Sequence, residues 1–248
     1  DGKGGVIMTE AELIPIWISL KTAGTATLIT FILGIAAARW MAYGDFKGKN
    51  LLDGLFILPL VLPPTVLGFG LLLIFGKNGP LGQLLLYFDK TVIFSWSATV
   101  IASTVVAFPL MYQATRAAFE QIQPNLEDAA RTLGAKEWTV FWKISMPLAW
   151  PGIAAGTILA FARSLGEFGA TLMLAGNIPG RTQTAPLAIY FAVEAGRSDQ
   201  ALKWVLAILL ISFASIIALN YWKSRQYSSW RNGQPVVKEV VIDAGYRN

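Results

Sequence analysis

Arg163 and Glu167 are the two side chains whose types and spacing most suggest chemistry. They are four positions apart, so they share one face of a helix and can form an ion pair. They follow an uncharged run and enter a Gly-containing segment, a position typical of functional charges in membrane proteins. A mutually neutralising pair at the interface is an equally good interpretation. Acid–base catalysis by Glu167 is a poorer one, because no second titratable partner for it lies nearby in the sequence.

Enzymatic chemistry is further restricted by what the chain lacks. Its 248 residues contain no histidine and no cysteine. This excludes disulfides, thiol nucleophiles, imidazole-based catalysis and the common zinc and haem ligand sets. We therefore expect no catalytic residues, no metal site and no enzymatic activity in this chain.

A second group of charges lies in the polar stretch 121–147. Asn125 is a plausible helix N-cap, and Gly134 stands where a helix-terminating glycine is expected. Four apolar residues between them recur at helical spacing: Leu126, Ala129, Ala130 and Leu133. The pattern predicts a short amphipathic helix outside the bilayer. From pattern alone, an ordinary surface helix is as good an interpretation as a functional one.

The elements around these charges are membrane helices. Hydrophobic residues make up 54% of the chain and charged residues 14%, about half the charged share of a soluble domain. A charge in the middle of the bilayer costs about 2.5–3.5 kcal/mol, so membrane spans are expected where charges are missing. Five uncharged runs are long enough to approach or cross the bilayer: 22–38 (extended by 13–20), 54–76, 91–115, 144–162 and 204–222. Two shorter runs, 168–180 and 182–193, read as re-entrant or interfacial segments.

The distribution of basic residues predicts the orientation of these spans. If 121–147 is cytoplasmic and there are five spans, 12 of the 20 Lys and Arg residues fall inside and six outside. This excess places the N-terminus outside and the C-terminus in the cytoplasm. The net charge of +5 suits contact with anionic lipid, and nucleic-acid binding is a poor interpretation of so apolar a chain.

Three local motifs bear on function. The stretch 70–78 has five residues between its glycines, and Asn78 follows its lysine, so it is not a nucleotide-binding P-loop. Pro63 and Pro64 predict a kink in the second span, which could be a pore-side bend or only a packing feature. Gly152 and Gly156 permit close helix approach, within the chain more plausibly than in a dimer.

The stretch from Asp128 to Gly134 resembles the EAA loop of permeases from binding-protein-dependent ABC importers. The family pattern is Glu-Ala-Ala, three residues, Gly, nine residues, Ile, one residue and Leu-Pro. Here the matching positions are Asp128, Ala129, Ala130, Gly134, Ile144 and Pro147. Asp128 and Met146 replace the family's Glu and Leu without any change of spacing.

The resemblance covers residues 13–225 and points within the family to molybdate permeases. The segments 58–68, 129–135 and 161–180 resemble those of the molybdate, tungstate and sulfate group, and 164–171 with 176–180 favour molybdate. The implied function is an ATP-driven molybdate importer subunit with alternating access. Sulfate or tungstate is the alternative substrate, and a stand-alone secondary anion transporter or channel is the alternative class.

The resemblance also implies an architecture and a set of partners. The chain would be an all-α integral membrane protein with the type I ABC importer permease fold, consisting of about five transmembrane helices, short re-entrant or interfacial helices and a cytoplasmic coupling helix. It would pair with a second copy in the cytoplasmic (inner) membrane, bind two ATPase subunits inside and receive substrate from an external molybdate-binding protein. ATP and Mg²⁺ would be bound by the ATPases, with no cofactor on this chain.

The roles implied for individual residues are of two kinds. The coupling helix, in a loop spanning 117–147, would contact the ATPase through Glu127, Asp128, Ala129, Ala130, Arg131, Gly134 and Ala135. The translocation path or gate would include Pro63, Pro64, Arg163, Ser164, Glu167, Phe168, Gly169 and Thr171. Residues 1–12 would be an extracytoplasmic N-terminal segment, 13–225 the transmembrane domain and 226–248 a cytoplasmic tail.

Overall fold

The computed structural model describes residues 8–232, and in this part of the chain every regular element is a helix. In chain order the elements are α1 (Glu10–Tyr43), α2 (Lys49–Val61), α3 (Pro64–Phe75), α4 (Pro80–Leu86), α5 (Trp96–Glu120), α6 (Pro124–Thr132), α7 (Glu137–Val140), the π-helix η1 (Phe141–Ser145), α8 (Met146–Leu165), α9 (Gly169–Ala175), α10 (Ala185–Glu194) and α11 (Ser198–Asn232). The predicted all-α class is confirmed.

The number of membrane spans agrees with the expected five. Four helical stretches are long and apolar enough to cross a bilayer: Glu10–Tyr43, Trp96–Glu120, Glu137–Leu165 and Ser198–Ile217. The pair α2 and α3 passes the same test together and makes the fifth if it counts as one span. Each span extends past at least one end of the uncharged run that predicted it, because charged and aromatic residues at the ends of a span can reach the interface while the backbone stays helical.

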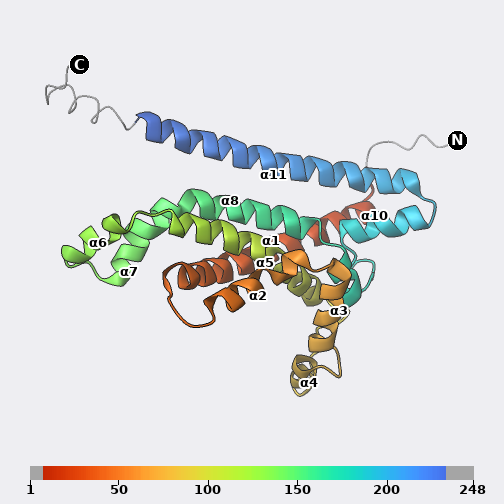
Figure 1. Cartoon of the computed structure of the whole chain (residues 1–248). Coiled ribbons are helices and arrows are strands. Elements are labelled where there is room, and N and C mark those ends of the chain that lie inside the picture. The colour runs from red at the N-terminus through yellow and green to blue at the C-terminus, as the bar shows by residue number, and fades with distance from the viewer. Residues whose placement is uncertain (1–7, 233–248) are drawn as a thin grey trace.

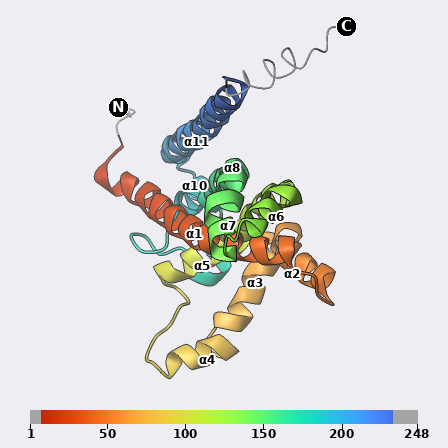
Figure 2. The same cartoon turned by 90° about the vertical axis from the view of Figure 1, so that its left-hand side faces the viewer.

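The run 54–76 is not one straight helix. The helix is interrupted between Val61 and Pro64, and the direction of α3 is bent by 115° from that of α2. Pro63 is the N-cap of α3 and Pro64 its first residue, which follows from the missing proline N–H and its fixed φ. The kink predicted from the prolines is therefore confirmed, and it is large. The bend lays the start of α3 against α9, and α4 projects away from the bundle (Figure 1 and Figure 2).

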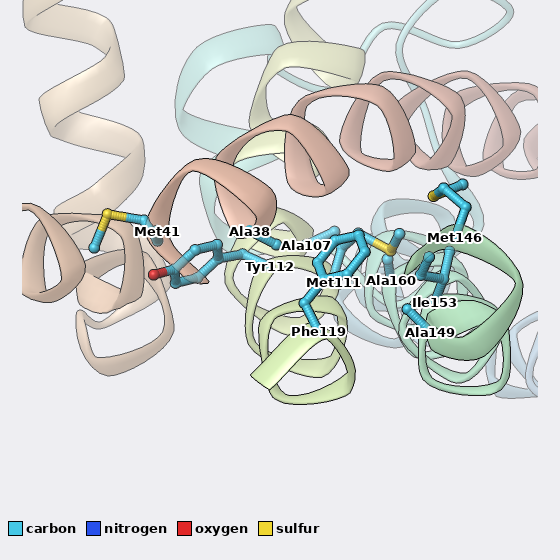
Figure 3. Packing of buried hydrophobic residues seen from close by; sticks show 10 residues of the cluster. All are labelled: Ala38, Met41, Ala107, Met111, Tyr112, Phe119, Met146, Ala149, Ile153 and Ala160. Carbon is cyan, nitrogen blue, oxygen red and sulfur yellow. The ribbon is translucent and has the colours of Figure 1, made fainter. Parts of the chain in front are cut away.

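The core lies where α1, α5 and α8 pack together. Tyr112, Met111 and Ile153 are fully buried here, and the cluster is completed by small residues such as Ala38 and Ala107 (Figure 3). A Cβ atom on Gly152 would lie 2.5 Å from the Cβ of Ala118 on α5, and one on Gly156 would lie 3.0 Å from the Cβ of Ala114. The glycine pair thus serves packing within the chain, as expected, because small residues let membrane helices approach closely.

The two short runs each contain one short helix, α9 and α10. The backbone N–H of Ala185, at the start of α10, donates to Ser19 Oγ of α1 at 2.7 Å. The start of α11 is held to α1 as well, by Lys203 Nζ at 3.1 Å from Glu12 Oε1 and by Trp204 Nε1 donating to the Glu12 carbonyl at 2.7 Å. These polar contacts fix α10 and the start of α11 against α1.

The bundle has two distinct ends. The start of α1, α10 and the start of α11 lie at one end, and α6, α7 and the far end of α11 lie at the other (Figure 1). The last helix continues past the predicted boundary at 225 to Asn232. The rest of the proposed tail, 233–248, and the first seven residues lie outside the described part of the chain.

Candidate functional site

The predicted amphipathic helix in the polar stretch exists as α6. It begins at Pro124, with Gln123 rather than Asn125 at the N-cap, so the expected cap residue was wrong by two positions. Proline is favoured at the first helical position because its missing N–H would have no acceptor there. Gly134 follows the helix with φ +83° and donates its N–H to the Arg131 carbonyl at 2.9 Å. Only glycine adopts this conformation without strain, which explains its place.

The outer face of α6 is apolar and uncovered. Leu133 is 89% exposed and Leu126 48% exposed, and Ala129 beside them is exposed as well. Leaving the large apolar side chains of a helix beyond the membrane spans in water costs free energy, roughly 25 cal/mol per Å² of apolar surface. This face has the composition of a surface that another protein covers.

The inner face of α6 is fastened by one buried carboxylate. Glu127 is 4% exposed, and its Oε1 accepts hydrogen bonds from the Tyr43 hydroxyl of α1 and from Ser145 Oγ of η1, each at 2.6 Å. Arg131 Nη2 lies 3.4 Å from Oε2. Glu127 therefore points into the chain, where it joins the helix to two other elements, and not toward the outer face.

Arg131 connects α6 to α7. Its Nε donates to Glu137 Oε1 at 2.7 Å and its Nη1 to Asp128 Oδ1 at 2.8 Å. The hydrogen bonds that Arg131 donates to Glu137 and Asp128 raise the pKa of Arg131 further above its ordinary value, so the guanidinium stays charged. Asp128 and Glu137 are mostly exposed, so solvent screens both pairs and they add little stability. The network fixes orientation more than it adds stability.

The predicted gate residues meet where α3 packs against α9. A Cβ on Gly169 would lie 2.8 Å from Pro64 Cβ, and one on Gly68 would lie 2.8 Å from Ala170 Cα. The second proline of the bend is therefore brought against the start of α9. Phe168, the N-cap of α9, turns instead toward α10, where its ring centroid lies 5.1 Å from that of Tyr190.

The ion pair predicted from spacing is present. Arg163 Nη1 lies 2.9 Å from Glu167 Oε2, and the Glu167 side chain is 1% exposed. Glu167 Oε1 also accepts the backbone N–H of Ala170 at 2.8 Å, so the carboxylate caps the start of α9. Both carboxylate oxygens have partners, as a buried charge requires. The pair thus fixes the joint between α8 and α9.

Ser164 and Thr171, which flank this joint in the sequence, carry buried hydroxyl groups without partners in the described part of the chain, and so does Thr184 at the start of α10. Ser164 Oγ, Thr171 Oγ1 and Thr184 Oγ1 have no hydrogen-bond partner among the described residues. Each belongs to a residue that is less than 5% exposed. Unpaired buried hydroxyls are uncommon and cost free energy.

The structure adds residues that the sequence did not indicate. Tyr43 and Ser145 hold Glu127, and a second cluster joins α2 to α5. In that cluster the Tyr112 hydroxyl donates to Asp53 Oδ1 at 2.6 Å, and Arg116 Nη1 pairs with the same oxygen. The sequence offered one signal for this cluster: Asp53 stands at the start of an apolar helix, and a charge near a membrane span needs a partner.

The chain is similar to known membrane subunits of transport systems. Residues 30–225 match the family described as binding-protein-dependent transport system inner membrane component. YvgM of Bacillus subtilis (strain 168) is 50% identical over 211 residues, covering 85% of this chain and 93% of the relative. The molybdenum transport system permease protein ModB of Escherichia coli (strain K12) is 44% identical over 223 residues, covering 89% and 96%. The sulfate transport system permease protein CysT of the same strain is 32% identical over 220 residues, covering 88% and 79%.

Two solved structures share the fold at low sequence identity. A chain of the bacterial alginate ABC transporter, in complex with alginate pentasaccharide-bound periplasmic protein, superposes with a TM-score of 0.72 at 18% identity, covering 88% of this chain and 80% of that one. A chain of the MetNI methionine ABC transporter, in an inward-facing conformation, gives 0.64 at 18% identity, covering 86% and 99%. The predicted fold of ABC importer membrane subunits is confirmed.

Proposed function

Since the chain belongs to the family of binding-protein-dependent transport system inner membrane components, we propose that it is the membrane-spanning permease subunit of an ATP-driven molybdate importer. The greater identity to the molybdenum permease ModB (44%) than to the sulfate permease CysT (32%) supports molybdate as the substrate. The subunit carries out transport and not chemistry, and ATP with Mg²⁺ is bound by partner ATPases.

The observation that carries the proposal is the construction of α6. Its outer face offers uncovered apolar side chains, whereas its inner carboxylate is hydrogen-bonded to α1 and η1. A helix built in this way can transmit force from a docked protein into membrane helices. We therefore assign α6 as the coupling helix, with Asp128, Ala129, Ala130 and Ala135 in the region of the ATPase contact. In this assignment Glu127 and Arg131 hold the helix in place.

The substrate end of the chain is the joint between α8 and α9. A tetrahedral oxyanion needs hydrogen-bond donors along its path through the bilayer, and the hydroxyls of Ser164 and Thr171 lack partners here. The contact of Pro64 with Gly169 couples this joint to the bend of α2 and α3. We infer that movement at this contact opens and closes the path.

We also propose an assembly and an orientation for the chain. Exposed apolar side chains on α2, on the outer part of α3 and on α4, which projects from the bundle in Figure 1, support pairing with a second copy across the pore. The end that carries α6 is the cytoplasmic one in this proposal, with the N-terminus outside and the C-terminus inside the inner membrane. An external molybdate-binding protein delivers the anion at the opposite end.

The test is anion-stimulated ATP hydrolysis in liposomes that hold this chain, its ATPase and its binding protein. We expect stimulation by molybdate at lower concentration than by sulfate. Stimulation by sulfate alone would transfer the assignment to a sulfate permease, and tungstate should be measured beside both. Anion uptake without the ATPase would instead indicate a stand-alone transporter or channel.

A matched pair of variants tests the docking surface directly. Leu133→Asp places a charge on the most exposed apolar position of α6 and should abolish co-purification of the ATPase without changing the melting temperature. Leu133→Met, which keeps the apolar surface, should retain the ATPase. Normal assembly of Leu133→Asp would remove α6 from the interface.

A further inference from the structure

An apolar groove runs between α1, α7 and α8 on the side of η1. It has a volume of about 580 Å³ and is lined mainly by aromatic and aliphatic side chains, including Phe31, Ile35, Trp138, Trp142 and Trp150. The only basic side chain among its lining residues is Arg39, near the end of α1. The groove therefore combines long apolar walls with a single cation.

Arg39 is held in place, but in the described part of the chain no carboxylate oxygen forms an ion pair with it, and Glu137 acts on it only through the longer-range attraction of opposite charges. Its guanidinium carbon lies 4.3 Å from the ring centroid of Phe141 and 4.9 Å from that of Tyr43. Its Nη1 is buried without a hydrogen-bond acceptor, and within residues 8–232 it forms no ion pair. A buried N–H of a charged group is costly to leave unpaired. The two rings attract the cation, but they do not replace an acceptor oxygen.

The one acidic side chain lining the groove does not supply that oxygen. Both carboxylate oxygens of Glu137 accept hydrogen bonds from Arg131, at 2.7 and 3.2 Å. Its charge is thus compensated on the side of α6. Lys136 and Lys143, on the same stretch of chain, are exposed and add positive charge nearby.

The walls of the groove belong to two candidate membrane spans, Glu10–Tyr43 and Glu137–Leu165. Trp142 is 49% exposed, Trp150 40% and Ile32 61%, so the groove opens outward along apolar surface. Partly exposed tryptophans are typical of the level where lipid headgroups meet acyl chains. A ligand that fits must carry an anionic oxygen at one end and long apolar chains at the other.

We propose that this groove is a binding site for an anionic phospholipid. The headgroup phosphate accepts hydrogen bonds from Arg39, and an acyl chain lies along Phe31, Ile35 and Trp150. Guanidinium and phosphate form the stronger, charge-assisted class of hydrogen bond. The site depends on the chain spanning a membrane and not on which anion it transports.

The experiment is native mass spectrometry of the purified full-length chain, titrated with phosphatidylglycerol or with phosphatidylcholine of the same acyl chains. We expect one phosphatidylglycerol to bind with preference. Arg39→Gln should weaken this binding about tenfold, the loss of one charge-assisted hydrogen bond, and Arg39→Lys should restore part of it. Arg197→Gln, the same change at an exposed arginine at the other end of the bundle, should have no effect.

Four outcomes would overturn the proposal. Two concern the lipid: equal binding of the two lipids, and binding of phosphatidylglycerol that Arg39→Gln leaves unchanged. The other two concern the occupant: soluble glycerol phosphate that binds as tightly as the lipid, and a cross-linker placed at position 142 that joins the chain to a second protein chain. If Arg39→Gln does not fold, Trp142→Ala keeps the cation but removes part of an exposed wall. It should also lower the number of bound phosphatidylglycerol molecules.

Discussion

The Tyr43 hydroxyl donates a 2.6 Å hydrogen bond to Glu127 Oε1, across 84 positions of the chain. This contact joins the end of the first membrane helix to the helix that we assign to coupling. Because Ser145 donates to the same oxygen at the same distance, α1, α6 and η1 meet at one atom. Movement of α6 cannot leave the other two elements unaffected while these bonds persist.

Replacing Glu127 should therefore cost stability. Glu127→Ala leaves the Tyr43 and Ser145 hydroxyls without their shared acceptor and should lower the free energy of unfolding by about 1–3 kcal/mol. Asp128→Ala, one position away but with a 66% exposed side chain, should change it by less than about 1 kcal/mol. Denaturant unfolding in detergent checks both. Equal effects of the two variants would contradict the role of Glu127.

Gly134 tests the end of the coupling helix. Because its φ is +83° and a Cβ added there would have no atom within 4 Å, the constraint is conformational and not steric. Gly134→Val should cost about 1–2 kcal/mol and reduce co-purification of the ATPase. Gly134→Asn should be tolerated, because asparagine adopts this conformation more readily. Full transport by Gly134→Val would refute a role for this turn.

The pair at the joint of α8 and α9 should behave as a unit. Arg163→Met leaves a carboxylate that is 1% exposed without its cation, and the loss should reach up to about 3–5 kcal/mol. Because Arg163 is itself 31% exposed, we expect the lower part of that range. The double variant Arg163→Met/Glu167→Gln should recover part of the loss. Additive effects in this double-mutant cycle would show that the two groups act independently.

Alanine substitutions at Gly152 and Gly24 distinguish the effect of close helix packing from the effect of helix propensity. Gly152→Ala places a methyl group 2.5 Å from Ala118 Cβ and should destabilise the chain by about 1–3 kcal/mol. Gly24→Ala, in α1 with nothing within 4 Å, should be neutral or stabilise by about 0.4–1 kcal/mol. Thermal unfolding measures both changes. Adding Ala118→Gly to Gly152→Ala should restore stability, and failure to do so would place the strain elsewhere.

Local features of the sequence predicted local features of the structure. The ion pair of Arg163 with Glu167 was predicted from a spacing of four, although Glu167 lies just past the end of α8, and the glycine turn after α6 follows from a single residue's conformational freedom. The membrane helices could be predicted in the same way, because a run without charges is a property of consecutive residues. The break between α2 and α3 was predictable from Pro63 and Pro64, but its angle of 115° was not.

Contacts between distant residues could not be predicted from one sequence. Glu127 was grouped with Asp128 at the surface of the coupling helix, since their chemistry is alike and only packing distinguishes a 4% exposed residue from a 66% exposed side chain. Tyr112 with Asp53, and Pro64 with Gly169, are likewise brought together by the way helices pack. No periodicity or spacing encodes which faces meet.

The π-helix η1, between α7 and α8, holds one residue more than an α-helix of the same length. Its mark is the backbone N–H of Met146 donating to the carbonyl of Phe141, five residues earlier. If that extra residue were absorbed into regular α-helix, everything before it would turn about 100° around the axis of α8. Ser145, the last residue of η1, is also a donor to Glu127. If α6 is the coupling helix, as we propose, a pull on it would reach α8 at η1, where the loss or gain of the extra residue would add rotation to the movement.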